Sequence, residues 1–267
     1  MAPVTDRQLE VDGASLAYEV QEGTGPVVVA LHGLSSSRAV ERAAGFFDWS
    51  PVARAGRTLV RYDARGHGRS TGRAEPGDYA WSALAEDLFA LLDVVSPDEP
   101  VDAIGVSMGV GTLLHAAARR PERFRRLAFV IPPTAWATRA AQADGYRQMA
   151  RMAEERGYDA LVRAMGAFAP LPLLEEGGWT VAPPPDIDPA ILPAVFRGAA
   201  GTDFPSPEVV AAIDRPVLLA PWVGDPGHPV STTEQLHELL PQATLALLDS
   251  PAALRALGDR IAAFFAD

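Results

Sequence analysis

The alternation of apolar and polar positions along the chain predicts strands that alternate with helices. Two short alternating runs flank the dipeptide Asp12-Gly13, which is a strong signal for a β-hairpin. Six later apolar runs are typical of strands that are buried on both faces of a sheet. These runs are 26–33, 101–107, 126–133, 216–222 and 244–249, together with the β-rich run that opens 57–68 before its glycine turn.

Segments with apolar residues at helical spacing lie between most of these runs. Trp81, Leu84, Leu88 and Leu91, for example, recur at intervals of three or four residues, which places them on one face of a helix. Strands that alternate with helices indicate a mostly parallel sheet with helices on both faces, here an eight-stranded sheet in an α/β fold. The predicted helices are 78–95, 108–120, 231–240 and 251–265.

One long segment interrupts this alternation, because it separates two sheet strands without containing a convincing strand. It carries apolar residues at helical spacing, among them Tyr158, Leu161 and Phe168, and Pro-rich connectors. A segment of this length needs structure of its own in a compact domain, and its Met and aromatic residues are expected to pack rather than react. The predicted domains are therefore a core of residues 1–133 and 215–267 and a helical cap of residues 134–214.

Composition narrows the class of protein. The 267 residues are 48% hydrophobic, which is enough for a sizeable core, and the net charge of -11 is opposite to that of a nucleic-acid binder. No apolar run reaches the ~18 residues of a membrane span, and no secretory signal is visible at the start. We therefore expect a cytoplasmic protein whose partner is a small-molecule substrate, with neither nucleic acid nor a membrane as partner.

The residue types that are missing exclude several kinds of chemistry. The chain has no Cys, so it has no thiolate nucleophile and no disulfide. All 23 basic residues are Arg, so a lysine Schiff base is excluded as well. The five histidines are scattered without metal-ligand spacing, and we expect no metal and no cofactor.

The stretch Gly105-Val106-Ser107-Met108-Gly109 lies between a predicted buried strand and a predicted helix. This context is the one in which a G-x-S-x-G pattern forms a sharp turn that exposes the serine hydroxyl. Gly105 and Gly109 leave room where strand and helix nearly touch. The pattern predicts Ser107 as a nucleophile, with the backbone N–H of Met108 as one donor of an oxyanion hole.

With this turn, the chain resembles the α/β-hydrolase superfamily over nearly its whole length. The residues "LHG" at 31–33 resemble the family's His-Gly turn, and "YDARGHGRS" at 62–70 resembles its second signature. The resemblance implies that the N–H of Leu34 is the second oxyanion donor and that His32 and Gly33 support the turn. It further implies a cofactor-independent hydrolase that acts through a serine, a histidine and a carboxylate.

The usual place for the catalytic histidine is empty. In this family that histidine follows the last strand in a glycine-rich loop, whereas here the last apolar run passes Asp249 straight into a helix that begins near Ser250. No histidine occurs after His237, which is expected to face solvent. His32, His67 and His115 are expected to have structural roles.

The loop "WVGDPGHPV" after the run 216–222 offers a replacement. It carries Asp225 early and His228 three residues later, and such loops gather at the carboxyl edge of the sheet beside the serine turn. Two interpretations stay open. Either Ser107, His228 and Asp225 form an altered catalytic arrangement, or the loop is a rigid turn in which His228 bonds its own backbone.

Three functions follow from these alternatives. The first is a serine hydrolase of a small apolar ester, lactone or thioester. The second is a non-hydrolytic enzyme of the same fold, such as a cyclase, isomerase or lyase, since fold alone does not determine function. The third is a ligand-binding protein with a dead active site.

Overall fold

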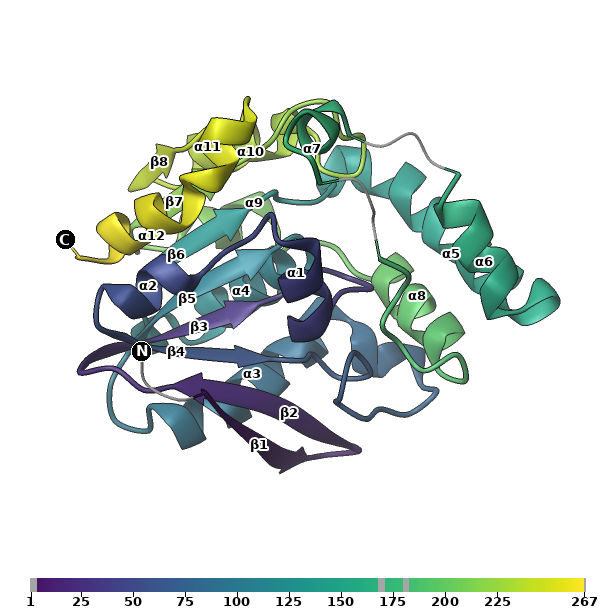
Figure 1. The fold of residues 1–267 in the computed structure, drawn as a ribbon, viewed down its shortest axis with the longest axis horizontal. Coiled ribbons are helices and arrows are strands. Elements are labelled where there is room, and N and C mark those ends of the chain that lie inside the picture. Colours follow the sequence, from purple (N-terminus) through teal and green to yellow (C-terminus); the bar gives the residue numbers. More distant parts are fainter. Residues whose placement is uncertain (1–3, 168–170, 180–182, 267) are drawn as a thin grey trace.

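The computed structural model describes residues 4–167, 171–179 and 183–266. Eight strands form a single sheet (Figure 1). They are β1 (Val4–Val11), β2 (Ala14–Gln21), β3 (Gly25–Leu31), β4 (Arg57–Tyr62), β5 (Val101–Val106), β6 (Phe124–Val130), β7 (Val217–Ala220) and β8 (Ala243–Leu245).

The order of the strands in the sheet is β1-β2-β4-β3-β5-β6-β7-β8. The hairpin of β1 and β2 pairs antiparallel, and β2 joins β4 antiparallel. Every later pair, from β4–β3 to β7–β8, is parallel. The predicted α/β fold with a mostly parallel eight-stranded sheet is therefore confirmed.

The helices of the core and of the segment between β6 and β7 have the following bounds. In the core they are α1 (Arg38–Ala44), α2 (Ser50–Arg54), η1 (Pro76–Tyr79), α3 (Trp81–Val95), α4 (Met108–Arg119), η2 (Pro121–Arg123), α10 (Val230–Leu239), α11 (Pro251–Arg255) and α12 (Leu257–Ala266). Between β6 and β7 they are η3 (Trp136–Thr138), α5 (Arg139–Arg156), α6 (Tyr158–Met165), α7 (Pro172–Glu176), α8 (Leu192–Ala200) and α9 (Pro207–Ala211).

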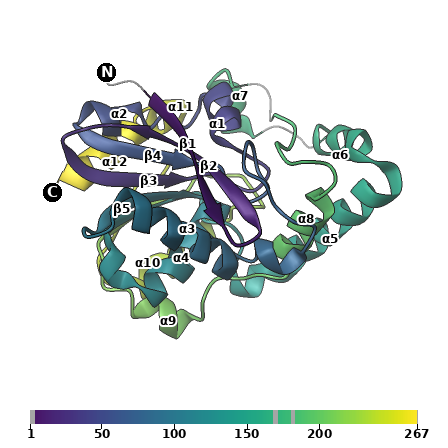
Figure 2. The ribbon, with the colours of Figure 1, turned by 90° about the horizontal axis from the view of Figure 1, so that it is seen from below.

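Helices cover both faces of the sheet because the central strands are apolar on both sides. All six residues of β5 are buried, and its side chains alternate between two clusters: Ala103 packs under α3 and α4, and Ile104 packs under α12. Figure 2 shows α3, α4 and α10 on one side of the sheet and α2 and α12 on the other. The sheet is thereby held rigidly, with its carboxyl edge left for the site.

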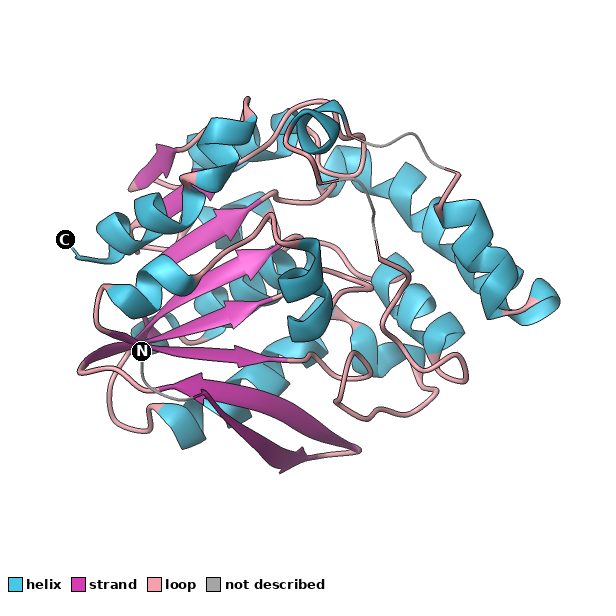
Figure 3. Cartoon of the chain, viewed as in Figure 1, coloured by secondary structure: helices cyan, strands magenta, loops and turns pink. Residues whose placement is uncertain are grey.

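Between β6 and β7 the described residues contain helices and no strand, as the sequence predicts. Helices α5, α6 and α8 share a small core of their own, in which Leu161 and Phe196 are buried and Tyr158 and Met165 pack beside them. Phe168 of the predicted apolar stripe lies outside the described residues. Figure 3 shows these helices beyond the carboxyl ends of the strands. The boundaries of core and cap at residues 134 and 214 stay a prediction.

Two predicted elements near the end of the chain are wrong in their extent. The helix expected over 251–265 is divided at Ala256 into α11 and α12. Helix α12 packs against α2, and Gly258 lies too close to the carbonyl of Asp48 to accommodate a side chain. The strand expected over 244–249 ends at Leu245, and only one further bridge joins Trp222 to Leu248.

None of the helices in the described ranges combines the length and the apolar character that crossing a lipid bilayer requires.

Candidate active site

The turn between β5 and α4 places Ser107 in a strained backbone conformation, with φ 50° and ψ -108°. A Cβ on Gly105 would lie 2.6 Å from the carbonyl carbon of Gly109, and one on Gly109 would lie 2.7 Å from the carbonyl oxygen of Leu31. Only glycine fits at these two positions. A positive φ in a residue other than glycine persists where the surroundings impose it, which is a feature of functional sites.

The loop after β7 forms a compact turn around Asp225. Its Oδ1 accepts a 2.8 Å hydrogen bond from the N–H of Gly227, and its carbonyl oxygen accepts one of 3.1 Å from the N–H of His228. The N–H of Thr134, just beyond β6, donates to the carbonyl of Gly227 at 3.1 Å. The turn is therefore tied both to itself and to the neighbouring strand end.

This turn directs His228 at the serine. The Oγ of Ser107 lies 2.8 Å from Nε2 of His228, and Nδ1 of His228 lies 2.7 Å from Oδ2 of Asp225. Both ring nitrogens thus bond side chains rather than the backbone of their own turn. A neutral imidazole that donates from Nδ1 to the carboxylate and accepts the serine proton at Nε2 satisfies both bonds. The ring of Trp222 meets the imidazole edge to face, with centroids 5.9 Å apart.

The carboxyl group of Asp225 is kept ionised. Burial acts to raise its pKa, but the hydrogen bonds from His228 and from the N–H of Gly227 outweigh burial and leave the pKa below its usual value. A charged acceptor at this position favours the imidazole with its proton on Nδ1 and stabilises the imidazolium form.

Two backbone N–H groups without a partner among the described residues belong to residues that adjoin the serine turn, Met108 in sequence and Leu34 through its neighbour Gly33. Gly33 is next to Ser107, since a Cβ on Gly33 would be 3.4 Å from Cβ of Ser107. Within the ranges that the structure describes, the N–H groups of Leu34 and Met108 make no hydrogen bond. Met108 is also the first residue of α4, whose N-terminal end attracts negative charge. An anion that forms at Ser107 can therefore be bound by unpaired donors.

The other histidines have partners or positions that suit structural roles. Nδ1 of His32 lies 2.8 Å from the carbonyl of Gly33, and its Nε2 accepts a 2.9 Å bond from the N–H of Ala64. Burial, with the nearby His32, lowers the pKa of His67 to about 3, so this ring stays neutral. His115 bonds a backbone carbonyl, and His237 is exposed on α10, as expected.

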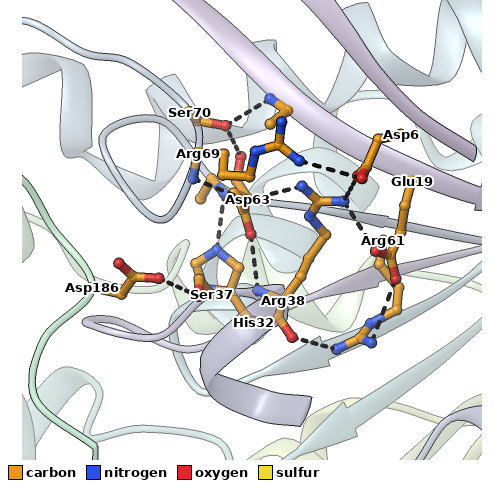
Figure 4. Close-up of polar contacts among 12 residues, drawn as sticks. Asp6, Glu19, His32, Ser37, Arg38, Arg61, Asp63, Arg69, Ser70 and Asp186 are labelled. Carbon is orange, nitrogen blue, oxygen red and sulfur yellow. Dashed lines mark hydrogen bonds and ion pairs between the residues drawn. The ribbon is translucent and has the colours of Figure 1, made fainter. Parts of the chain in front are cut away.

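A buried charge network lies under the turn that carries Leu34 (Figure 4). Asp63, at the end of β4, accepts bonds from the backbone N–H of Arg38 at 2.8 Å and from its guanidinium at 3.2 Å. The same guanidinium pairs with Glu19 of β2 at 3.1 Å and with Asp6 of β1 at 2.9 Å. Asp63 therefore ties α1 to the sheet and also accepts a bond from the N–H of Arg69 in its own turn.

Asp63→Ala is expected to lower the free energy of unfolding at neutral pH by roughly 3 kcal/mol, because it removes the buried carboxylate that bonds both the backbone N–H and the guanidinium of Arg38. Burial acts to raise the pKa of Asp63, but the hydrogen bonds from Arg38 outweigh it and lower the pKa. The carboxylate therefore adds stability above its unfolded pKa of about 4, and this contribution is lost as the pH falls through the folded value.

Urea unfolding at pH 7 and at pH 3 measures both effects. The difference in the free energy of unfolding between wild type and Asp63→Ala should be smaller at pH 3 than at pH 7. Glu22→Gln is the matched control, since Glu22 pairs with Arg7 at an exposed position and should change stability by less than about 1 kcal/mol. If both variants lost the same free energy of unfolding, the network around Asp63 would not be a major contributor to stability.

Sequence reasoning missed the backbone partners of the site. Nothing in the local pattern places Thr134 against Gly227, or Asp186 beside Ser35, because these contacts depend on how distant loops fold together. Among the described residues, no group of three or more His, Asp or Glu side chains is arranged to hold a metal ion.

Residues 26–162 match the family model described as alpha/beta hydrolase fold, so the chain belongs to that family. It is 30% identical over 122 residues to an epoxide hydrolase of Caballeronia sordidicola. That match covers 46% of this chain and 35% of the relative, so the chain spans only about a third of that curated protein.

Two solved structures extend the similarity to 98% of this chain. The enol-lactonase from Burkholderia xenovorans LB400 superposes with a TM-score of 0.77 at 20% identity over its full length. The bottromycin epimerase BotH, solved with bottromycin A2, superposes with a TM-score of 0.73 at 24% identity over 98% of its chain. At these identities the likeness shows a shared fold.

Proposed function

We propose that this chain is a cofactor-independent serine hydrolase with Ser107 as nucleophile, His228 as general base and Asp225 as the group that orients the base. The observation that carries the proposal is the continuous chain of hydrogen bonds from Ser107 Oγ through the imidazole to the carboxylate, at 2.8 and 2.7 Å. These lengths lie within the reach that proton transfer requires.

In the proposed reaction, Oγ of Ser107 attacks the substrate carbonyl carbon while its proton passes to Nε2 of His228. The ionised Asp225 stabilises the resulting imidazolium. The N–H groups of Leu34 and Met108 bind the tetrahedral oxyanion. The imidazolium then protonates the leaving group, and the acyl-enzyme remains.

The second half of the reaction uses the same groups. A water molecule attacks the acyl carbon and gives its proton to Nε2 of His228. The new tetrahedral intermediate collapses, Ser107 leaves as the hydroxyl by taking that proton back, and the acid product is released. Apart from the substrate and this water molecule, both halves use only groups of the chain.

The proposed substrate is a small, largely apolar ester, lactone or thioester. Trp222 borders His228, and Phe46 packs on Trp222 with ring centroids 6.3 Å apart, so the surroundings of the base are aromatic. The helical segment 134–214 would act as a cap that shields the acyl group from water. The name of the enol-lactonase, a structural neighbour, is consistent with a lactone among these classes.

A non-hydrolytic activity is the second candidate. The named epimerase among the structural neighbours uses the same fold over 98% of this chain, so the scaffold is compatible with such chemistry. In that case His228 would move a proton on the substrate and Ser107 would not be acylated. A binding protein without catalysis is less well supported, because the strained backbone at Ser107 has no use in a receptor.

A fluorophosphonate probe separates these functions. We expect it to modify Ser107, because the reagent needs a serine whose proton is removed by a nearby base, and to give one adduct, located by peptide mass spectrometry. In Ser107→Ala, the peptide that contains residue 107 should carry no adduct. Ser37 is the internal control, since it is buried and its hydroxyl donates to Asp186.

One pair of results would contradict the proposed hydrolase function. If the folded wild type stays unmodified and Ser107→Ala keeps full turnover on the true substrate, the serine is not a nucleophile. The non-hydrolytic candidate would then be favoured.

A further inference from the structure

The turn that carries Leu34 is held from outside the core by Asp186, a residue of the segment between β6 and β7. The N–H of Asp186 donates to the carbonyl of Ser35 at 3.0 Å, and its own carbonyl accepts a bond from the N–H of Gly68 at 2.8 Å. The next residue, Ile187, forms a bridge with His67. Residues 186–187 therefore lie as a short strap between the oxyanion turn and the turn after β4.

The side chain of Asp186 makes a second attachment to the oxyanion turn. Oγ of Ser37 donates to Oδ2 of Asp186 at 2.6 Å and accepts a bond from the N–H of Val40, which caps α1 (Figure 4). Ser37 is fully buried, so no water competes for its hydroxyl. A short bond from a buried hydroxyl to a carboxylate is one of the stronger hydrogen bonds in proteins.

The two attachments to the oxyanion turn lie at and just after the residue at which this turn is strained. Ser35 has a φ of 65°, in the region that favours glycine, and it directly follows Leu34. The bond to its carbonyl and the bond at Ser37 hold two of the three residues after Leu34 in place. The direction of the Leu34 N–H therefore depends on the strap as well as on the core.

We propose that Asp186 is a positioning residue for the Leu34 oxyanion donor, and that it couples the strap to the reactivity of Ser107. The inference rests on the proposed hydrolase function. Any movement that lifts the strap from the core would release Ser35 and Ser37 together. The oxyanion hole would then be complete only when the strap is seated.

Asp186→Ala removes the side-chain attachment and keeps both backbone bonds. We expect kcat on a p-nitrophenyl ester to fall about tenfold, which is less than the roughly 10²–10³-fold cost of deleting a donor outright. KM should change by less than about twofold, because the donor acts mainly on the transition state. Asp186→Asn should restore most of kcat, since its amide oxygen can accept the bond from Ser37.

Asp188→Ala is the matched control. Asp188 directly follows the strap, is exposed, and accepts a bond from the N–H of Ala190. It should loosen the strap locally without changing kcat. Hydrogen exchange of the peptide that contains residues 34–37 should become faster in Asp186→Ala and stay unchanged in Asp188→Ala.

Two results would overturn the inference: equal kcat in the Asp186 and Asp188 variants, or unchanged exchange at residues 34–37 in Asp186→Ala. Failure of the proposed function would look different. Ser107→Ala would then keep wild-type turnover on the same ester, and the exchange measurement would still show whether Asp186 holds the turn.

Discussion

His228→Ala is expected to lower kcat/KM on a reactive ester by on the order of 10⁴-fold or more. The imidazole is the group 2.8 Å from the serine oxygen, and in the described part of the chain no other side chain bonds that hydroxyl. Without a base, Ser107 must lose its proton to water. The oxyanion donors alone then support only a residual rate of reaction. Steady-state kinetics at neutral pH, with thermal unfolding as a check on the fold, measures this.

His237→Ala is the control for that experiment. His237 is exposed on α10 and lies nine residues from His228 in the sequence, so its loss should leave kcat/KM unchanged. If His228→Ala kept most of its activity while Ser107→Ala lost it, the base would have to be another group, and the proposed relay would be wrong.

Asp225→Asn is expected to lower kcat/KM by roughly 10³–10⁴-fold. Asp225 uses one oxygen for the N–H of Gly227 and the other for Nδ1 of His228. The side chain of asparagine has a single oxygen. If that oxygen accepts the bond from the N–H of Gly227, the NH₂ group faces Nδ1 of His228. The ring then carries its proton on Nε2 and cannot accept the proton of Ser107. The loss should appear in kcat with little change in the affinity for substrate.

Asp249→Asn is the matched control, because Asp249 lies where the family's usual histidine loop would begin and is exposed. It should behave as wild type. A large loss in Asp249→Asn together with a small loss in Asp225→Asn would mean that the acid and its histidine partner have been assigned to the wrong loop.

The sequence predicts the sheet and the serine turn well, because both depend on local patterns. Apolar runs that alternate with helices specify which residues are buried, and the glycines around Ser107 reflect contacts within one strand-turn-helix unit. The division between α11 and α12 could not be predicted, because the helical spacing of Leu254, Leu257 and Ile261 continues through it.

The position of His228 relative to Ser107 could not be predicted from local sequence patterns. The loop could be singled out because it joins a carboxylate and a histidine after a sheet strand. Its conformation depends on Gly224 at φ 84°, on the bond from the N–H of Gly227 to Asp225, and on the bond from Thr134. The last of these comes from another strand end, so the distance to Ser107 follows only from the tertiary structure.

The location of base and acid on one turn before α10 has a practical consequence. In the proposed mechanism β8, α11 and α12 contribute no reacting group, and they serve only to complete the sheet and cover one of its faces. Substitutions there can change thermal tolerance while turnover per folded molecule stays constant. This edge of the molecule is therefore suited to attaching a surface tether or a fused reporter without disturbing the chemistry.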